Sequence, residues 1–396
     1  MEAIQITLPS SKSISNRWLA LDYLSFNGIK IKNLSAADDT QLLKRLLRQM
    51  KMGRRHTFDC RDAGTAARFI TALLAVTPGT HVVSGSERLC QRPMAPLIDA
   101  LRSIGCQIKC QEEEGFLPIQ IEGVTPSVSR IAIDCSQSSQ FASALLLAAI
   151  SMPLGMAVEL TGAPASEPYI KMTLDMLSRA GVQWALKGNP PAYFVEHNIP
   201  QCDAVSIEKD WSAASYFYAV AAMRPNCRLH MSGLSYPSLQ GDCVAMDIFS
   251  KLGVVSANNG LAIEIERTGK VAESLQYDFT NCPDLVPAVA VACAGLGIEA
   301  QLTGIDNLRH KESNRVEAIV VELTKMGCRI EADNDQIHIY PSQLVVNHPV
   351  ETYNDHRIAM AFATLKALHP QMEILNPEVV SKSFPSFFEM LNRALS

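Results

Sequence analysis

Short polar segments recur along the chain, and a run of small or apolar residues follows each of them. The first segment is residues 9–17 (PSSKSISNR), which precede the apolar residues 18–21 (WLAL). Serine, asparagine and aspartate are favoured at helix N-caps, so each segment predicts the start of a helix. Similar starts occur at residues 62–68, 138–141, 210–215, 283–285 and 354–357. Starts that recur every roughly 50 to 75 residues predict repeated supersecondary units.

A second pattern repeats downstream of most of these starts: an amphipathic helix that ends on a glycine and runs into a strand. Such helices are predicted over residues 97–105, 172–181, 244–253 and 316–327, and they end on Gly105, Gly181, Gly253 and Gly327. Glycine just after the last helical residue adopts the left-handed conformation at little cost. The two patterns together predict an α/β fold made of six units with two helices each.

Local patterns predict further elements. Helices are expected from Lys12 to about Asn27, from Asp38 to Gln49, and over residues 286–294, the last one capped by Asp284. Strands are predicted over residues 1–9, 30–34, 57–60, 81–84, 131–134 and 204–208.

The length of 396 residues suits two domains of three units each. We expect the first domain to span residues 10–207 and the second to combine residues 1–9 with 208–396, because pseudo-symmetry would assign the first strand to the second half. The linker would then be double, near residues 9–10 and 207–208.

Composition narrows the class of partner and compartment. A net charge of −5, without a run of Lys and Arg, argues against nucleic acid. No basic segment with an apolar core follows Met1, and the apolar run 141–150 is too short to cross a membrane. The 11 scattered cysteines favour reduced thiols in a cytoplasmic protein. Cys106 and Cys110 lack a histidine or a second cysteine pair at a supporting distance, so no metal site is predicted.

Cations stand at the predicted helix entrances of this acidic protein. A cation there opposes the helix dipole unless it holds an anion. We read Lys311 and Arg315 as one helical turn apart, where like charges cost about 0.2–0.5 kcal/mol unless an anion relieves them. Solvated charges and simple capping remain the alternatives, and His356 or Tyr169 could merely pack. The set is Lys12, Arg92, Lys311, Arg315, Arg357 and Lys382.

In their order along the chain, these and neighbouring motifs resemble the 5-enolpyruvylshikimate-3-phosphate (EPSP) synthases, or 3-phosphoshikimate 1-carboxyvinyltransferases, over essentially the whole chain. The matching motifs are residues 11–17, 63–66, 91–93, 138–141, 168–170, 212–216, 311–313, 354–357 and Lys382. The resemblance implies a two-domain inside-out α/β barrel with three βαβαββ units in each domain. It also implies a monomer that needs no cofactor and no metal.

The reaction implied by the resemblance is transfer of the enolpyruvyl group of phosphoenolpyruvate to the 5-hydroxyl of shikimate 3-phosphate, through a tetrahedral intermediate, with release of phosphate. Asp284 would accept the hydroxyl proton and Glu312 would protonate the methylene carbon. The resemblance assigns catalysis to Lys12, Asp284, Glu312 and His356. It assigns phosphoenolpyruvate binding to Lys12, Gly64, Arg92, Gln140, Arg315, Arg357 and Lys382. It assigns shikimate 3-phosphate binding to Lys12, Ser13, Arg17, Ser138, Ser139, Gln140, Ser166, Asp284, Asn307 and Lys311.

The chain also departs from the family pattern. Ser10, Trp18 and Asn314 replace the usual glycine, a small residue and aspartate, and Asp62 replaces a frequent asparagine beside the phosphoenolpyruvate site. The last change bears on affinity for phosphoenolpyruvate and on the response to glyphosate. Residues 51–60 form a shorter segment than in most members, which predicts that one unit has lost a hairpin.

Two alternatives stay open. The sister family transfers enolpyruvyl to UDP-N-acetylglucosamine, but its members carry Lys-Asn where this chain has Lys12-Ser13, and usually a reactive loop cysteine, for which Cys90 is the candidate. A catalytically silent anion-binding protein is the second alternative, against which the retained acid and base carboxylates speak.

Overall fold

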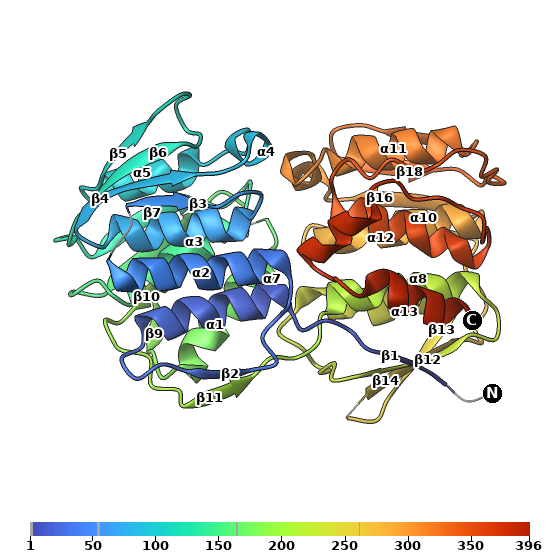
Figure 1. Ribbon diagram of the computed structural model, residues 1–396, viewed down its shortest axis with the longest axis horizontal. Coiled ribbons are helices and arrows are strands. Elements are labelled where there is room, and N and C mark those ends of the chain that lie inside the picture. Colours follow the sequence, from blue (N-terminus) through green and yellow to red (C-terminus); the bar gives the residue numbers. More distant parts are fainter. Residues whose placement is uncertain (1–2, 54–55, 164, 261) are drawn as a thin grey trace. The chain divides into compact units, whose positions relative to one another are not determined.

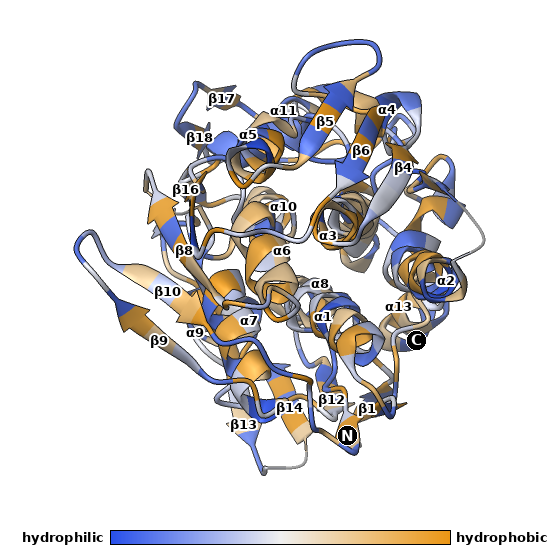
Figure 2. Cartoon of the chain, turned by 90° about the vertical axis from the view of Figure 1, so that its left-hand side faces the viewer, coloured by the Kyte–Doolittle hydropathy of each residue, from blue (hydrophilic) through white to orange (hydrophobic). Residues whose placement is uncertain are grey.

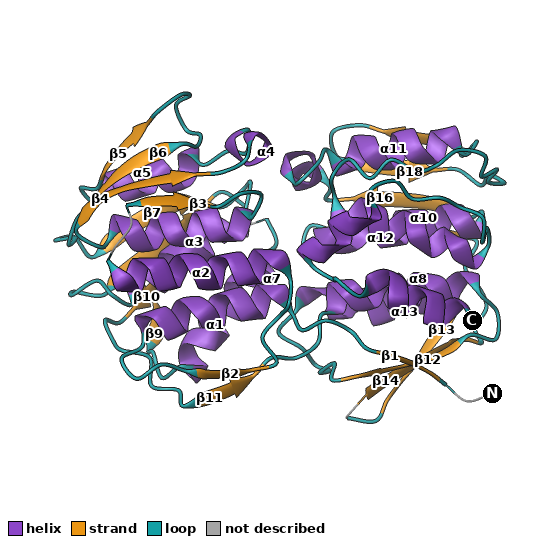
Figure 3. Ribbon diagram, in the orientation of Figure 1, coloured by secondary structure: helices purple, strands orange, loops and turns teal. Residues whose placement is uncertain are grey.

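The computed structural model describes residues 3–53, 56–163, 165–260 and 262–396. The chain divides into two compact units, shown in Figures 1 and 3. The N-terminal unit is Lys12–Ile207, and the C-terminal unit combines Met1–Ser11 with Glu208–Ser396. The first boundary therefore follows Ser11, slightly later than the residues 9–10 expected from the sequence.

The N-terminal unit alternates helices and short strands. Its helices are α1 (Lys12–Leu24), α2 (Asp38–Met52), α3 (Gly64–Ala75), α4 (Glu87–Cys90), α5 (Ala95–Ser103), α6 (Ser139–Ala149) and α7 (Glu167–Arg179). Its strands are β2 (Lys30–Lys32), β3 (Thr57–Asp59), β4 (Gly79–Ser84), β5 (Gln107–Cys110), β6 (Ile119–Gly123), β7 (Arg130–Asp134), β8 (Met156–Thr161), β9 (Trp184–Lys187), β10 (Ala192–Val195) and β11 (Ala204–Ser206).

The C-terminal unit contains more 3-10 helix, labelled η. Its helices are η1 (Gly241–Val244), η2 (Pro283–Leu285), η3 (Asp306–His310), η4 (Thr364–Ala367), η5 (Pro377–Lys382), α8 (Trp211–Met223), α9 (Ala245–Lys251), α10 (Val286–Leu296), α11 (Arg315–Lys325), α12 (His356–Ala363) and α13 (Phe387–Leu395). Its strands are β1 (Ile4–Ile6), β12 (Arg228–Ser232), β13 (Val254–Asn258), β14 (Ala262–Arg267), β15 (Ser274–Asp278), β16 (Glu299–Thr303), β17 (Ile330–Ala332) and β18 (Gln336–Ile339).

Four four-stranded sheets in the described part of the chain share one topology. In each, the first strand pairs in parallel with the second, and an antiparallel hairpin completes the sheet. The orders are β3-β4-β6-β5, β7-β8-β10-β9, β1-β12-β14-β13 and β15-β16-β18-β17. The predicted repeat is confirmed in these four copies. In the third, β1 pairs with β12, Ile4 opposite Leu229, so the first strand joins the C-terminal unit as the sequence predicted.

The other two repeats are reduced. Strands β2 and β11 form a two-stranded parallel sheet. Within the described residues, α2 leads to β3 without an antiparallel hairpin, which matches the predicted loss. In the C-terminal unit, the corresponding pairing is a single parallel bridge between Val350 and Ile374, followed by α13 at the end of the chain.

Apolar helices form the centre of each unit. Helix α6 is almost wholly buried and packs on α3, and α8 packs on α10 in the same way. Figure 2 views the N-terminal unit along α3 and α6, with the strands β4 to β6 and β8 to β10 to the outside. Helices that are apolar on all sides are expected inside a core, so the helix ends are the positions left for polar chemistry.

Most local predictions hold, with shifted ends. The four glycines predicted to end helices have positive φ, for example +94° at Gly105 and +79° at Gly327. Helix α1 ends at Leu24, short of Asn27, whereas α2 continues to Met52, beyond Gln49. The prediction that Asp284 caps α10 is wrong. Asp284 lies inside η2, and Leu285 occupies the position before α10. Among the described residues, we find no helix with the length and hydropathy needed to traverse a bilayer.

Candidate active site

Arg315 is the centre of a charged cluster in the C-terminal unit. Its side chain is only 1% exposed, although it is the first residue of α11. Its Nε donates to Oδ2 of Asp355 at 2.8 Å, Nη1 to Oδ1 of Asp284 at 3.1 Å, and Nη2 to Oε2 of Glu312 at 2.7 Å. A buried cation needs such partners, since an unpaired one would be very costly. Three carboxylates thus converge on one guanidinium.

Asp284 contacts two further cations. Nη2 of Arg357 donates to its Oδ2 at 2.7 Å, and Nζ of Lys311 lies 3.9 Å from its Oδ1. Burial alone would raise the pKa of Asp284, but the charges of Arg357, Lys311 and Arg315 outweigh burial and hold this pKa well below its usual range. The carboxylate is therefore ionised and is the shared acceptor of the cluster.

Asp355 joins the start of α12 to the cluster. Its Oδ1 accepts the backbone N–H of Arg357 at 2.9 Å, and its Oδ2 accepts the hydroxyl of Ser313 at 3.0 Å as well as Nε of Arg315. The buried ring of His356 has its Nδ1 3.7 Å from Oδ1 of Asp355. Asp355 lies inside a predicted helix start, but its role in holding Arg315 was not foreseen.

Asp242 is a further carboxylate that the sequence reasoning missed. It lies in η1, it is buried, and it accepts a hydrogen bond from Ser212 at the start of α8. Nη2 of Arg357 reaches the same serine hydroxyl at 3.4 Å. Burial, followed by the nearby charge of Asp284, raises the pKa of Asp242 to about 7. The signal available was an acid at the start of a 3-10 turn, which is common enough to pass unnoticed.

Two predictions about the cations are wrong in their local geometry. Lys311 and Arg315 are not one turn apart on a helix, because Lys311 is extended and α11 begins only at Arg315. They still converge, since both approach Asp284. Lys382 stands at the end of η5 and not at a helix entrance; η5 packs against α12, which carries Arg357.

In the N-terminal unit, Arg92 lies over the start of α3. A Cβ built on Gly64, the first residue of α3, would stand 2.6 Å from Nη1 of Arg92 and 3.0 Å from its Nη2. The absence of a side chain at Gly64 is what allows this approach. The structure thus brings together two residues that the sequence proposed for the same anion.

Lys12 begins α1 and is paired across to α2. Its Nζ lies 3.0 Å from Oδ2 of Asp39, and both side chains are largely buried. Asp39 is on α2, in the reduced repeat. Ser13 follows Lys12 in the first turn, and its carbonyl accepts a hydrogen bond from Arg17 at 3.0 Å.

Arg17 is buried and joins three helices. Its Nε donates to Oγ1 of Thr173 at 2.7 Å, and its Nη2 donates to Oγ of Ser143 at 2.9 Å and to the carbonyl of Tyr169 at 3.1 Å. Burial lowers its pKa to about 10. These bonds give Arg17 a structural role in the N-terminal unit, beside the ligand role implied by the resemblance.

The serine-rich start of α6 is only partly explained by capping. Ser138 is the N-cap and accepts the backbone N–H of Gln140 at 3.3 Å, and Ser139 is buried in the first turn. Ser166 precedes α7 with a left-handed φ of 60°, a conformation that is strained for serine. In the described part of the chain, Oε1 of Gln140 and Oδ1 of Asn307 are buried and accept no hydrogen bond. Such acceptors suit the hydroxyls of a ligand.

Comparisons with known proteins place the chain in a family. The family model described as EPSP synthase (3-phosphoshikimate 1-carboxyvinyltransferase) matches residues 53–391. The chain belongs to the EPSP synthase family. A 3-phosphoshikimate 1-carboxyvinyltransferase of Bacteroides fragilis is 38% identical over 392 residues, which are 98% of this chain and 94% of the relative. One of Methanospirillum hungatei is 34% identical, with 97% and 94% covered.

Solved structures confirm the fold. An EPSP synthase of Acinetobacter baumannii superposes with a TM-score of 0.76 at 23% identity, covering 98% of this chain and 95% of the other. At that identity the likeness supports the two-unit α/β architecture and not the site. The predicted fold class is therefore confirmed.

Two departures from the EPSP synthase pattern, Asn314 and Asp62, have side-chain partners in the structure, whereas nothing in it explains the changes at Trp18 and Ser10. Asn314 caps α11, accepting the backbone N–H of Glu317 at 3.3 Å and donating to its carboxylate at 3.0 Å. Trp18 is buried in α1, and Ser10 pairs with Lys209 in an antiparallel bridge. Asp62 accepts a hydrogen bond from the hydroxyl of Ser86, the N-cap of α4, so its carboxylate lies at the start of a neighbouring helix.

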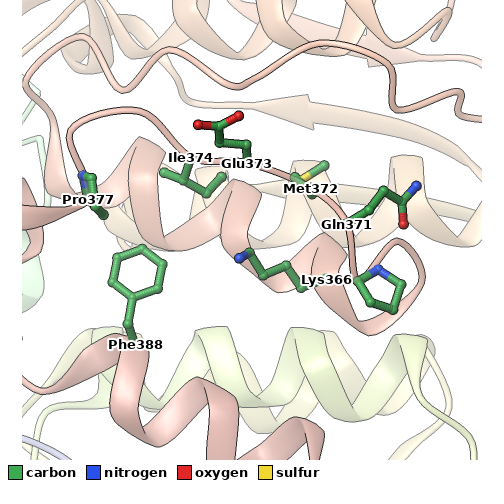
Figure 4. A pocket seen from close by; sticks show the side chains of 8 residues that line it. Lys366, Gln371, Met372, Glu373, Ile374, Pro377 and Phe388 are labelled. Carbon is green, nitrogen blue, oxygen red and sulfur yellow. The ribbon is translucent and has the colours of Figure 1, made fainter.

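Neither a metal-binding group nor a surface pocket extends the candidate site in the described part of the chain. Among the described residues, no group of three or more His, Cys, Asp or Glu side chains could hold a metal ion. An open surface pocket of about 620 Å³ beside Phe388 is shown in Figure 4. None of the residues proposed for catalysis or binding lines it. Its lining residues are Lys366, Pro370, Gln371, Met372, Glu373, Ile374, Pro377 and Phe388.

Proposed function

We propose that this chain transfers the enolpyruvyl group of phosphoenolpyruvate to the 5-hydroxyl of shikimate 3-phosphate and releases inorganic phosphate. The observation that carries the proposal is the position of Asp284, an ionised carboxylate held by Arg315, Arg357 and Lys311, with Glu312 bound to the same Arg315. The cluster offers a base, an acid and cations for an anionic substrate within one group of contacts. Membership in the EPSP synthase family supports the choice of substrates.

The proposed reaction proceeds by addition and then elimination. The 5-hydroxyl oxygen of shikimate 3-phosphate bonds to C2 of phosphoenolpyruvate, its proton goes to Asp284, and Glu312 gives a proton to C3. In the second step C3 returns a proton to Glu312 and the bond between C2 and the phosphate oxygen breaks; the departing phosphate takes the proton that Asp284 accepted. Both substrates are polyanions, so cations must offset their repulsion before carbon and oxygen approach.

The cluster contains as many carboxylates as cations when Asp242 is set aside. Lys311, Arg315 and Arg357 face Asp284, Glu312 and Asp355. Phosphoenolpyruvate must therefore compete with these carboxylates for the guanidinium groups. When it binds, its negative charge offsets the cations that depress the pKa of Asp284, so this pKa rises and the carboxylate becomes a stronger base.

Residues of both units have roles in the proposal. In the N-terminal unit, Lys12, Arg92, the backbone at Gly64 and the amide of Gln140 would bind phosphoenolpyruvate. In the C-terminal unit, Arg315, Arg357 and Lys382 would do so. Shikimate 3-phosphate would bind Ser13, Arg17, Ser138, Ser139, Gln140, Ser166, Asp284, Asn307 and Lys311. His356 would complete the catalytic set. We further propose a cytoplasmic monomer that binds no nucleic acid.

The sister reaction with UDP-N-acetylglucosamine finds no support at Cys90. The thiol donates to the carbonyl of Gly85 at 3.6 Å, and burial raises the pKa of Cys90. A thiol with a raised pKa is a poor nucleophile because it stays protonated.

Phosphate release from phosphoenolpyruvate tests the proposal. We expect the purified protein to release phosphate with shikimate 3-phosphate and not with shikimate or UDP-N-acetylglucosamine. Binding of shikimate 3-phosphate without any release would favour a silent anion-binding protein. Release with UDP-N-acetylglucosamine alone would favour the sister reaction.

A further inference from the structure

The segment that leads into α12 contains two consecutive left-handed residues that are not glycine. Tyr353 and Asn354 both have a φ of 53°. This conformation costs of order 1–3 kcal/mol at each such residue, and it is rarest for bulky side chains. The surrounding structure must hold the segment in place. The next residue is Asp355, which binds Arg315 and caps α12.

Glu322 on α11 holds this segment. Its side chain is only 1% exposed, yet it is a carboxylate on the face of α11 that packs into the core. Its Oε1 accepts the hydroxyl of Tyr353 at 2.6 Å and Nζ of Lys325 at 2.7 Å. Its Oε2 accepts the backbone N–H of Glu351 at 3.4 Å. A buried carboxylate is tolerated when donors of this kind surround it.

The same helix holds the segment at its other end. Arg315 begins α11, and Glu322 follows it about two helical turns later, so both lie on one face of the helix. Glu322 binds residues 351 and 353, and Arg315 binds residue 355. The segment is therefore hydrogen-bonded to α11 at two points, Glu322 and Arg315, and α12 begins directly after the second.

We propose that Glu322 and Tyr353 are positioning residues that fix Asp355 and, through it, the guanidinium groups of Arg315 and Arg357. Neither belongs to the residues that would touch substrate. Their effect passes through Asp355, whose two oxygens bind the Nε of Arg315 and the backbone of Arg357. The inference rests on the proposed function, because it assigns these two guanidinium groups to phosphoenolpyruvate.

The hydroxyl of Tyr353 suits this task. Burial raises its pKa, and the hydrogen bond to Glu322 raises it further, so the group stays a donor across the physiological range. The residue is 38% exposed, so removal of the hydroxyl leaves no cavity in the core. Tyr353→Phe is therefore a mild change that removes the hydrogen bond to Glu322 and keeps the fold intact.

The kinetic test compares Tyr353→Phe with Tyr340→Phe. Tyr340 makes the same kind of bond in the same unit, its hydroxyl donating to Oε2 of Glu331 at 3.1 Å. We expect Tyr353→Phe to raise the KM for phosphoenolpyruvate roughly tenfold, while the KM for shikimate 3-phosphate and the melting temperature change little. Tyr340→Phe should leave both KM values unchanged. Equal KM values for phosphoenolpyruvate in Tyr353→Phe and the wild type would overturn the inference while leaving the proposed function intact.

A pairwise test asks whether the two residues act together. Glu322→Leu, which removes the acceptor, should raise the same KM, and adding Tyr353→Phe to it should have little further effect, because one bond cannot be lost twice. Fully additive effects would contradict a shared role.

A second measurement does not depend on turnover. Amide hydrogen exchange of residues 351–357 in the ligand-free protein should be at least several-fold faster in Tyr353→Phe than in the wild type or in Tyr340→Phe. Unchanged exchange would overturn the inference even if the wild type released no phosphate, an outcome that would separately refute the proposed function.

Discussion

The guanidinium of Arg92 lies so close to Gly64 that a Cβ on the glycine would stand 2.6 Å from Nη1. Gly64→Ala should therefore displace this guanidinium, the flexible end of a long side chain, and leave the backbone in place. Loss of a hydrogen bond to a charged group costs about 1.5–3 kcal/mol, so the KM for phosphoenolpyruvate should rise roughly tenfold or more.

Alanine favours a helix over glycine by about 1 kcal/mol, so thermal stability should not fall in Gly64→Ala. Steady-state kinetics with each substrate varied in turn, together with a melting curve, checks both expectations. An unchanged KM for phosphoenolpyruvate would show that Arg92 does not bind it.

Asp284 is proposed as the base, and it also occupies Arg315 and Arg357. Asp284→Asn should lower kcat by roughly 10²- to 10⁴-fold, as expected for loss of a general base. Binding of phosphoenolpyruvate should be at least as tight as in the wild type, because one competing negative charge is gone. Single-turnover kinetics and equilibrium binding separate the two effects, with Asp247→Asn, an exposed acid of the same unit, as the control. Near-normal turnover in Asp284→Asn would show that Asp284 is not the general base.

Asp242 should make stability depend on pH. Its pKa is raised from 3.8 to about 7, mainly by burial, so the folded state binds more protons than the unfolded state between these values. Stability should therefore fall as pH rises through this window. The lowered pKa of Asp284 acts in the opposite sense and only at lower pH, where its protonation costs stability.

Asp242→Asn removes the first titration and keeps the shape of the side chain. The melting temperature of Asp242→Asn minus that of the wild type should grow between pH 4 and pH 7 and then level off. A difference that is constant over this range would show that Asp242 is ionised throughout.

Arg17 should matter for folding as well as for any ligand. Its bonds to Thr173, Ser143 and the carbonyl of Tyr169 are buried, and lysine cannot reproduce their geometry. Arg17→Lys should lower the free energy of unfolding by about 2–4 kcal/mol. Arg179→Lys, at an exposed ion pair with Asp175, should change it by less than about 1 kcal/mol. Urea denaturation of both variants measures this, and equal stabilities would leave Arg17 only its ligand role.

Local signals in the sequence carried much of the fold. Helix ends such as Gly105 and Gly327 follow from one residue and its neighbours, and the alternation of helix and strand follows from periodicity. The sequence also predicted that β1 belongs with the second half of the chain, but not that its partner there is β12. Helix ends at Leu24 and Met52 were less predictable, because tertiary packing decides where a fraying end stops.

The site was harder to predict where distant segments meet. Asp242, Asp355 and Glu322 are acids whose role comes from the cation or hydroxyl that each one faces. These contacts join residues that are far apart in the sequence, so no local pattern predicts them. Lys311 was misplaced on a helix because 3-10 and extended segments lack the periodicity that marks an α-helix. One signal was present: Glu322 falls on the apolar face of α11, where a charged residue requires a partner.

The route of the bridging oxygen of phosphoenolpyruvate tests enolpyruvyl transfer most directly. Phosphoenolpyruvate labelled with oxygen-18 between C2 and phosphorus would be incubated with the protein, with and without shikimate 3-phosphate, and the products analysed by mass spectrometry. Transfer breaks the bond between C2 and this oxygen, so the label should appear in inorganic phosphate, and only when shikimate 3-phosphate is present. Label found in pyruvate, or phosphate released without the acceptor, would mean cleavage between phosphorus and oxygen and would contradict the account.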